Sequence, residues 1–185
     1  MVEPSLLGAT MPCRPHAPAG HQSWRRSRAT ARTLPDIRLD IVREVPLAFD
    51  DDWVRRVVTA AVVATGRRTR TDLTVLLADD DHLRHLNTTF RGMDKATDVL
   101  SFEGGGPAGN VAYVGDVAIS VPRALDQGVC HGHGPAREVG YLLVHGVLHL
   151  LGHDHEDDAD MAAMRRVEED ALTRVRLGRP DAGTT

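Results

Sequence analysis

The stretch Pro135-Ala-Arg-Glu-Val-Gly-Tyr-Leu-Leu-Val-His145-Gly-Val-Leu-His149-Leu-Leu-Gly152-His-Asp-His155 is the segment around which we interpret the rest of this 185-residue chain. Pro135 suits the first position of a helix, and Gly152 is typical of the residue that ends one. The residues between them are apolar on nearly every side of such a helix. We therefore predict a helix from Pro135 to Leu151 that lies buried at the centre of the domain.

Three histidines in this stretch have the spacing of a metal site. His145 and His149 are four residues apart, so on a helix their side chains share one face, about one turn apart. Gly152 ends the helix, and His155 follows three residues later, which lets a third imidazole return to the same point. Three neutral nitrogens leave one tetrahedral position open for water, as in catalytic zinc sites. We predict one Zn²⁺ per chain, held by His145, His149 and His155; buried histidines satisfied by hydrogen bonds are the alternative, although unpaired imidazoles are costly to bury.

Other polar residues near this stretch receive weaker interpretations. Asp154 is a candidate catalytic residue, because it could orient a ligand imidazole through its second nitrogen or accept a proton. Its alternative is a turn-forming aspartate after a glycine. His153 is too close to His155 to share the ion easily, and we assign no role to His131 and His133, which lie in a glycine-rich segment.

The histidine offsets also match the H-E-x-x-H-x-x-G-x-x-H pattern of the metzincin proteases. In those enzymes the residue after the first histidine is the glutamate that deprotonates the water. Here that residue is Gly146, which cannot act as a base. A glycine inside a helix costs roughly 1 kcal/mol relative to alanine, so Gly146 and Gly140 indicate that another element packs closely there. A zinc protease therefore becomes a minor alternative.

The remaining chain alternates between strand and helix patterns before it becomes helical. Period-two apolar patterns and runs of β-branched residues predict strands, and acidic caps with 3.6-residue periodicity predict helices. The predicted strands are 37–43, 73–78, 99–102 and 114–120, and the predicted helices are 49–65, 79–90, 122–128, 135–151 and 156–176. The result is a single α+β domain with a four-stranded mixed sheet packed against helices and a metal site in its C-terminal helical half.

Both ends of the chain differ from this domain in composition. Residues 1–35 are rich in Arg, Pro, Gly and Ser without apolar periodicity, so we expect a disordered extension; a targeting segment or a start codon placed too early are the alternatives. We expect the domain at 36–178 and a disordered tail at 179–185. Apolar stretches are too short to span a bilayer. With two cysteines, Cys13 and Cys130, a disulfide framework is not expected and the cytoplasm is the default location.

Charge is distributed unevenly. Residues 1–35 carry a net charge of +4, so the rest of the chain carries −8. A mildly acidic domain is not an obvious nucleic-acid binder on bulk charge. Any RNA contact would need a local basic patch, for which Arg91, Lys95 and either Arg123 or Arg137 are candidates, or a basic partner.

A second informative stretch runs from Asn87 to Phe102 and places Arg91 and Lys95 around a turn between a helix and a strand. Lys95 is the only lysine beside 21 arginines, which hints at a requirement for a compact ammonium; an ordinary surface lysine is the alternative. Arg91 beside a metal site would suit a phosphodiester, because its guanidinium can bind the oxygens that gain charge in the transition state. Arg91 is thus a candidate catalytic residue.

The two motifs together resemble the YbeY endoribonucleases, a bacterial family of RNA-maturation and ribosome quality-control proteins. The resemblance covers roughly residues 36–178 and rests on the run from Asn87 to Phe102, the strand Gly115–Ser120 and the histidines of 145–155. It implies that the three histidines bind zinc and that Arg91 is a functional basic residue in the cleft. It also implies activity on single-stranded RNA, in maturation of the 3′ end of 16S ribosomal RNA.

We therefore expect a cytoplasmic zinc-dependent endoribonuclease whose partners are precursor ribosomal RNA and the ribosome or its small-subunit proteins. The attacking group is either water activated by the metal or the 2′-hydroxyl of the RNA, and the residues do not choose between them. The main alternative is a ribosome-assembly factor in which zinc holds the C-terminal helices together. Neither reading requires a membrane.

Overall fold

The computed structural model describes residues 35–105, 112–155 and 157–179. Within these ranges the chain forms four strands and five helices, and no predicted end lies more than two residues from the observed one. The elements are β1 (Ile37–Arg43), α1 (Asp51–Ala64), β2 (Thr71–Ala78), α2 (Asp80–Arg91), β3 (Val99–Glu103), β4 (Ala112–Ser120), α3 (Val121–Cys130), α4 (Pro135–Leu150) and α5 (Asp158–Arg174). The predicted extension and tail, apart from residues 35 and 179, lie outside the described residues.

The strands form one mixed sheet in the order β1-β2-β4-β3. The β1–β2 and β2–β4 pairs are parallel, and β3 runs antiparallel to β4 at the edge. Side chains along β2 alternate, with Leu73, Val75 and Leu77 buried and the residues between them partly exposed. This alternation is typical of a sheet that is covered on one face, and it confirms the predicted α+β class.

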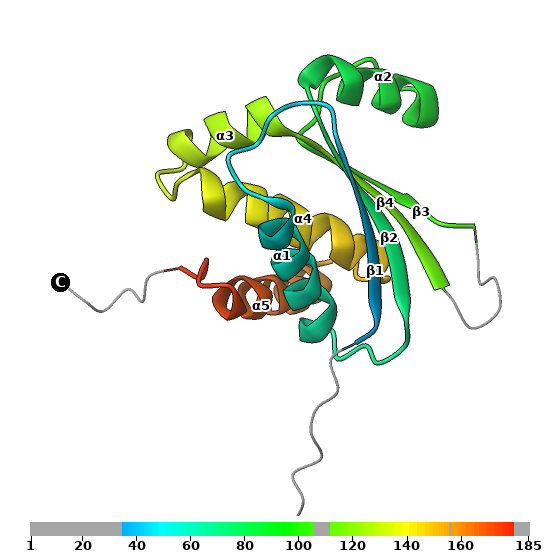
Figure 1. Cartoon of the computed structure of the whole chain (residues 1–185), viewed down its shortest axis with the longest axis vertical. Coiled ribbons are helices and arrows are strands. Elements are labelled where there is room, and N and C mark those ends of the chain that lie inside the picture. Colours follow the sequence, from blue (N-terminus) through cyan, green and yellow to red (C-terminus); the bar gives the residue numbers. More distant parts are fainter. Residues whose placement is uncertain (1–34, 106–111, 156, 180–185) are drawn as a thin grey trace, which may run out of the picture. The chain divides into compact units, whose positions relative to one another are not determined.

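Helices α1 and α4 lie against one face of this sheet, and α5 packs on these two helices (Figure 1). The main core lies between them and the sheet, and α4 contributes the largest share of it, including the fully buried Leu143, Val147 and Leu148. The central position predicted for α4 is therefore confirmed. Within the described ranges, no helix has the length and apolarity needed to cross a membrane.

Close packing of α4 explains its two glycines. A Cβ atom at Gly146 would lie 2.6 Å from a methyl carbon of Val117 on β4, and one at Gly140 would lie 2.7 Å from Leu177. The hydroxyl of Ser101 on β3 also donates to the carbonyl oxygen of Gly146 at 3.2 Å. The predicted close approach is thus confirmed, and it seats the histidine-bearing end of α4 directly on the sheet.

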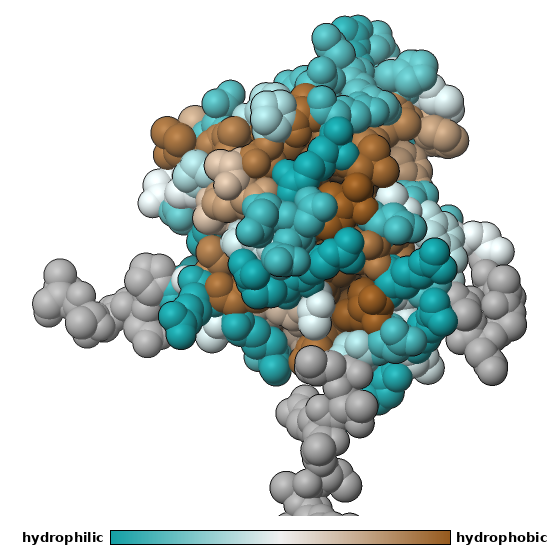
Figure 2. All heavy atoms as spheres, in the orientation of Figure 1, coloured by the Kyte–Doolittle hydropathy of each residue, from teal (hydrophilic) through white to brown (hydrophobic). Residues whose placement is uncertain are grey.

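Helix α2 buries only a narrow strip of its surface against the rest of the domain. Leu83 and Asn87 are its buried residues, and hydrophilic side chains dominate its surface on the face in view (Figure 2). The Asp79 carboxylate caps the first turn by accepting from the backbone N–H of His82 at 2.9 Å. Gly92 ends the helix in the left-handed conformation, with φ 69°. Arg91 is therefore the last helical residue, at the end of α2 that lies near β3.

Candidate metal centre

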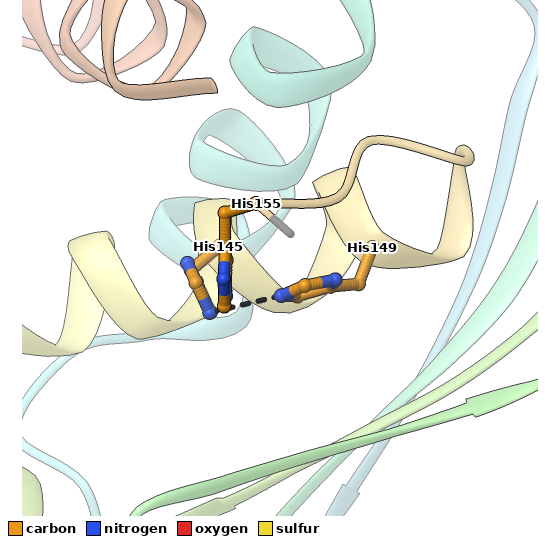
Figure 3. Close-up of side chains that lie close together, drawn as sticks. All are labelled: His145, His149 and His155. Carbon is orange, nitrogen blue, oxygen red and sulfur yellow. Dashed lines mark hydrogen bonds between the residues drawn. The ribbon is translucent and has the colours of Figure 1, made fainter. Parts of the chain in front are cut away.

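The three predicted ligands converge where α4 ends. His145 and His149 lie on one face of α4, and their Nε2 atoms are 3.1 Å apart. The ring of His155 lies 5.6 Å from that of His145 and 5.1 Å from that of His149, measured between centroids. Figure 3 shows the three imidazoles facing one another. One nitrogen from each ring falls within 4.8 Å of the others, so the spacing in the sequence does produce a common point in space.

The chain reversal after α4 brings His155 to this point. Gly152 adopts φ 82°, a conformation that side chains rarely tolerate, and lets the backbone turn sharply. The N–H of His153 then donates to the carbonyl oxygen of Leu148 at 3.0 Å, which closes the helix end. The carboxylate of Asp154 accepts from the backbone N–H of His155 at 2.8 Å. Gly152 and Asp154 therefore fix the backbone turn from which the third imidazole projects.

A buried glutamate lies behind the centre. Glu168, from the middle of α5, is 6% exposed, and its carboxylate lies 2.8 Å from Nδ1 of His145. A carboxylate can only accept, so Nδ1 of His145 carries the proton and its Nε2 lone pair faces the other two histidines. Burial, together with the nearby His145 and His155, holds the pKa of His149 below its ordinary value. His149 therefore stays neutral, and available as a ligand, at lower pH than a free histidine.

This donor set fits a tetrahedral metal ion. Two nitrogens bound to zinc at ~2.0–2.1 Å in tetrahedral geometry lie about 3.3 Å apart, close to the 3.1 Å between Nε2 of His145 and Nε2 of His149. Two nitrogens facing each other at that distance repel unless a proton or a cation lies between them. The tautomer that Glu168 selects in His145 leaves a lone pair at this point, which favours a ligand role.

The histidines line a cavity of about 610 Å³ that opens on the surface. Arg91 and Asp154 line the same cavity, together with Ser101 and Glu103 of β3. One Nη atom of Arg91 donates to the carbonyl oxygen of Ser101 at 3.3 Å. The two informative stretches of the sequence, separated by some 50 residues, thus meet in one cavity with the guanidinium and the imidazoles on its walls.

Among the described residues, the side chains of the other predicted site residues form no hydrogen bond with the three imidazoles. The carboxylate of Asp154 is 4.0 Å from Nδ1 of His149, beyond hydrogen-bond distance, and is largely exposed. Lys95 is exposed and does not line the cavity, and its backbone carbonyl accepts from Asn87 at 2.7 Å. Arg123 is bound to the Asp80 carboxylate at 2.7 Å.

The expectation that Arg137 could belong to a basic patch for RNA is wrong. Its side chain is 10% exposed and donates to Glu169 at 3.0 Å and to the backbone carbonyl of Leu177. It therefore connects α4 to α5 and the segment after it, and a phosphate backbone could not reach it. The sequence does not indicate this burial. Arg137 lies near the polar N-terminal end of α4, and it is buried only because α5 packs there.

The interpretation also missed Glu168, although the sequence contains a signal for it. Glu168 is four residues after Met164 and four before Leu172, both buried on the same face of α5. A carboxylate on the apolar face of a helix needs a buried partner. Such a position in a chain with a predicted histidine site would have been a reasonable candidate for the residue that orients a ligand.

Comparisons with known proteins agree with this geometry. A family model described as Endoribonuclease YbeY matches residues 42–176. A protein named Endoribonuclease YbeY from Chloroflexus aurantiacus is 40% identical over 149 residues, which cover 76% of this chain and 97% of that protein. One of the same name from Moorella thermoacetica is 42% identical over 135 residues, covering 68% and 86%.

Among solved structures, the solution structure of TM1509 from Thermotoga maritima has a similar fold. It aligns with a TM-score of 0.51 at 20% sequence identity and covers 80% of this chain and 99% of that one. This likeness supports the arrangement of strands and helices.

Proposed function

The chain belongs to the YbeY family of endoribonucleases, and on that premise we propose that it is a Zn²⁺-dependent hydrolase that cleaves single-stranded RNA. We assign the activity to residues 36–178 and its role to 3′-end maturation of 16S ribosomal RNA and to ribosome quality control in the cytoplasm. The observation that carries the proposal is the cavity that three converging imidazoles and Arg91 line together.

Each residue of the cavity has a role in this proposal. His145, His149 and His155 hold the ion, and Glu168 fixes the tautomer and ring orientation of His145. Zn²⁺, when bound, supplies Lewis acidity and water with a pKa of about 7. The exposed guanidinium of Arg91 binds the phosphate oxygens and stabilises the charge that develops on them.

Asp154 is the carboxylate of the cavity that we propose as proton acceptor. It lies on the turn that carries His155 and is open to solvent, so it can exchange protons with bulk water. In this position it can remove a proton from either attacking group, water or the 2′-hydroxyl. The products separate the two routes, because only attack by the 2′-hydroxyl leaves a 2′,3′-cyclic phosphate.

The acidic charge of the domain limits how RNA can bind. Phosphate contacts supply most of the affinity of nucleic-acid binding, yet Arg123 and Arg137 are already paired with carboxylates. The proposal therefore gives Arg91 the main phosphate contact within the cavity and leaves further positive charge to a partner, such as a protein of the small ribosomal subunit.

One contact favours a second candidate, an assembly factor whose zinc is structural. Glu168 joins α5 to His145 on α4, so an ion at the histidines would connect α4, the turn after it and, through Glu168, α5. In that case the metal would mainly hold the C-terminal helices together. The protease alternative has no support here, because Gly146 offers no base and its position against Val117 has no room for one.

The test combines metal analysis with an RNA cleavage assay on the full chain. Wild-type protein should contain zinc and cleave a single-stranded RNA oligonucleotide but not its duplex. His145→Ala should lower cleavage by more than about 100-fold, the most that loss of a residue supporting a metal ligand usually costs, while circular dichroism stays unchanged. His85→Ala, an exposed histidine on α2, is the matched control.

Two outcomes would overturn the catalytic reading. If zinc-loaded wild type cleaves no faster than background, or if His145→Ala loses its fold together with its zinc, the assembly factor with structural zinc is the better account.

A further inference from the structure

A second group of metal-type ligands lies at the other end of α4. α3 ends at Cys130 and α4 begins at Pro135, and His131 and His133 lie in the turn between them. Nε2 of His133 is hydrogen-bonded to the carboxylate of Glu138, in the first turn of α4. Nδ1 of His131 lies 3.5 Å from the same oxygen. One ligand atom from each of the three side chains falls within 4.8 Å of the others.

The backbone holds this turn in place. Gly132 and Gly134 adopt φ values of 71° and 84°, a left-handed conformation that glycine adopts readily and that allows the tight turn from α3 to α4. The N–H of Gly134 donates to the carbonyl of Gly128 at 2.9 Å, and the N–H of His131 donates to that of Gln127 at 2.8 Å. These backbone hydrogen bonds fix the turn that carries the two imidazoles beside Glu138.

Close packing beneath the turn adds to this rigidity. A Cβ atom at Gly128 would lie 2.8 Å from the backbone of Gly134, so the end of α3 and the turn are in direct backbone contact. Such contacts restrict the backbone of the turn that carries the two histidines. Because folding already orders the backbone of such a site, binding of a ligand loses less conformational entropy there.

The buried negative charge of Glu138 favours the binding of a cation. Its side chain is 5% exposed, and burying a carboxylate is costly unless it is paired. Among the residues that the structure describes, the ionisable groups within ion-pair distance of this carboxylate are the imidazoles of His131 and His133. An imidazole balances the charge of a carboxylate only when the ring is protonated. A divalent cation bound by all three groups would neutralise the buried charge.

We propose that His131, His133 and Glu138 form a second metal site, separate from the centre at His145. Two imidazole nitrogens and one carboxylate oxygen suit Zn²⁺, Ni²⁺, Co²⁺ or Cu²⁺ and are a poor match for Mg²⁺ or Ca²⁺. Three ligands leave at least one position for water or for a group from a partner.

The position along α4 separates the two sites. Glu138 precedes His145 by seven residues, a rise of about 10.5 Å along a helix. The ions of two-metal catalytic centres lie ~3.5–4 Å apart, so the second ion does not take part in the same chemical step. It would join the turn after α3 to the first turn of α4, the helix that carries His145 and His149. The proposal thus stands whether or not the chain cleaves RNA.

The experiment counts metal ions on full-length protein made without a polyhistidine tag. Metal-free protein is titrated with Zn²⁺ near pH 7.5 by calorimetry, and with Co²⁺ by absorption spectroscopy. We expect two equivalents for wild type, one for the double variant His131→Ala/His133→Ala, and one for His145→Ala. The control His85→Ala should retain two, and circular dichroism of the metal-free variants should match wild type.

Two further measurements, on the variant Glu138→Gln and on thermal unfolding, keep the test valid if one of the alanine variants fails to fold. The glutamine keeps the size of the side chain but removes the charge, so the affinity of the second equivalent should fall at least tenfold. In wild type the second equivalent should raise Tm, and it should not do so in His131→Ala, whose side chain is 57% exposed. One tight equivalent in wild type that His145→Ala abolishes and His131→Ala/His133→Ala leaves unchanged would overturn the proposal. His133 and Glu138 would then be a plain ion pair.

Discussion

Two clusters at opposite ends of α4 use similar residues in different surroundings. At the C-terminal end three imidazoles face one another, and the carboxylate of Glu168 stands behind His145. At the N-terminal end the carboxylate of Glu138 stands among the imidazoles, where a ligand would be. The side chain of His145 is 19% exposed and that of His131 57%. The difference teaches that the position of the carboxylate and the depth of the site decide what an ion can do there.

Depth matters because the first cluster forms one wall of a cavity and the second lies on a turn. In the cavity an ion, a guanidinium and a substrate can occupy one space, so that both positive charges can act on the same substrate. On the turn, an ion connects two helices. In our two proposals, the same histidine chemistry therefore serves a reaction at one end of the helix and cohesion at the other.

The largest effect that would sharpen this contrast is expected at Arg91, which we propose as the phosphate-binding residue of the first cavity. Arg91→Ala should lower kcat for RNA cleavage by about 100-fold, as expected for loss of one group that stabilises transition-state charge, with zinc content unchanged. Arg91→Lys should recover part of it.

Two controls accompany the Arg91 measurement. Arg174→Ala removes an exposed arginine paired with Asp170, and His131→Ala alters the second cluster. Both should stay within about twofold of wild type, since exposed ion pairs contribute little. If Arg174→Ala reduced cleavage as much as Arg91→Ala, the role of Arg91 would be lost.

A smaller effect is expected from the carboxylate behind His145. Glu168→Ala should weaken zinc binding at the first cluster by about 10-fold or more, within the usual range for a group that orients a ligand histidine. Glu168→Gln should lose less, because its amide oxygen still accepts from Nδ1 of His145. Competition with a chromophoric chelator measures the affinity without any activity assay.

Asp170→Asn, on the exposed side of the same helix, is the matched control for Glu168 and should bind zinc as wild type does. Equal zinc affinity in wild type and Glu168→Ala would mean that the buried carboxylate serves packing alone. Glu138→Ala should leave the first cluster's affinity unchanged, which distinguishes the two carboxylates.

The smallest effect concerns Tyr141, which lies on α4 between the clusters, with its ring 5.7 Å from that of His145. Burial and then the charges of Glu168 and Glu138 raise the pKa of this phenol above its ordinary value. A negative charge nearby disfavours the phenolate, so its removal must lower the pKa. Glu168→Gln should lower it more than Glu138→Gln.

The absorbance of tyrosinate measures this difference in metal-free protein. Tyr141 can be observed alone in a Tyr113→Phe background, because the chain has two tyrosines. Circular dichroism over the same pH range checks that the fold persists. If Glu138→Gln lowered the pKa of Tyr141 more than Glu168→Gln did, the prediction that Glu168 acts more strongly on this phenol would be wrong.

Local sequence patterns were enough to predict most of the fold and the first histidine cluster. The i, i+4 histidines and Gly152 act within a single turn of chain, so the sequence already contained the convergence of His145, His149 and His155. Caps such as Asp79 likewise marked helix ends. Contacts between distant elements were less accessible: Glu168 reaches His145 only because α5 packs on α4, and Arg137 is buried for the same reason.

The second cluster escaped sequence interpretation for a different reason. His131, His133 and Glu138 have no regular period, and their meeting depends on the left-handed conformations of Gly132 and Gly134. Glycines permit such turns without specifying them. The order of the strands, with β3 at the edge and antiparallel to β4, was also not contained in any local pattern.

The contact between Gly146 and Val117 has a consequence for what this chain could become. A metzincin-like protease needs a glutamate at this position, yet even a single methyl group there would collide with β4. The substitution that would supply the missing base would also lift the helix from the sheet and displace the histidines on either side of it. One point of steric contact thus closes the shortest mutational route from this hydrolase to a protease, although the two share their histidine spacing.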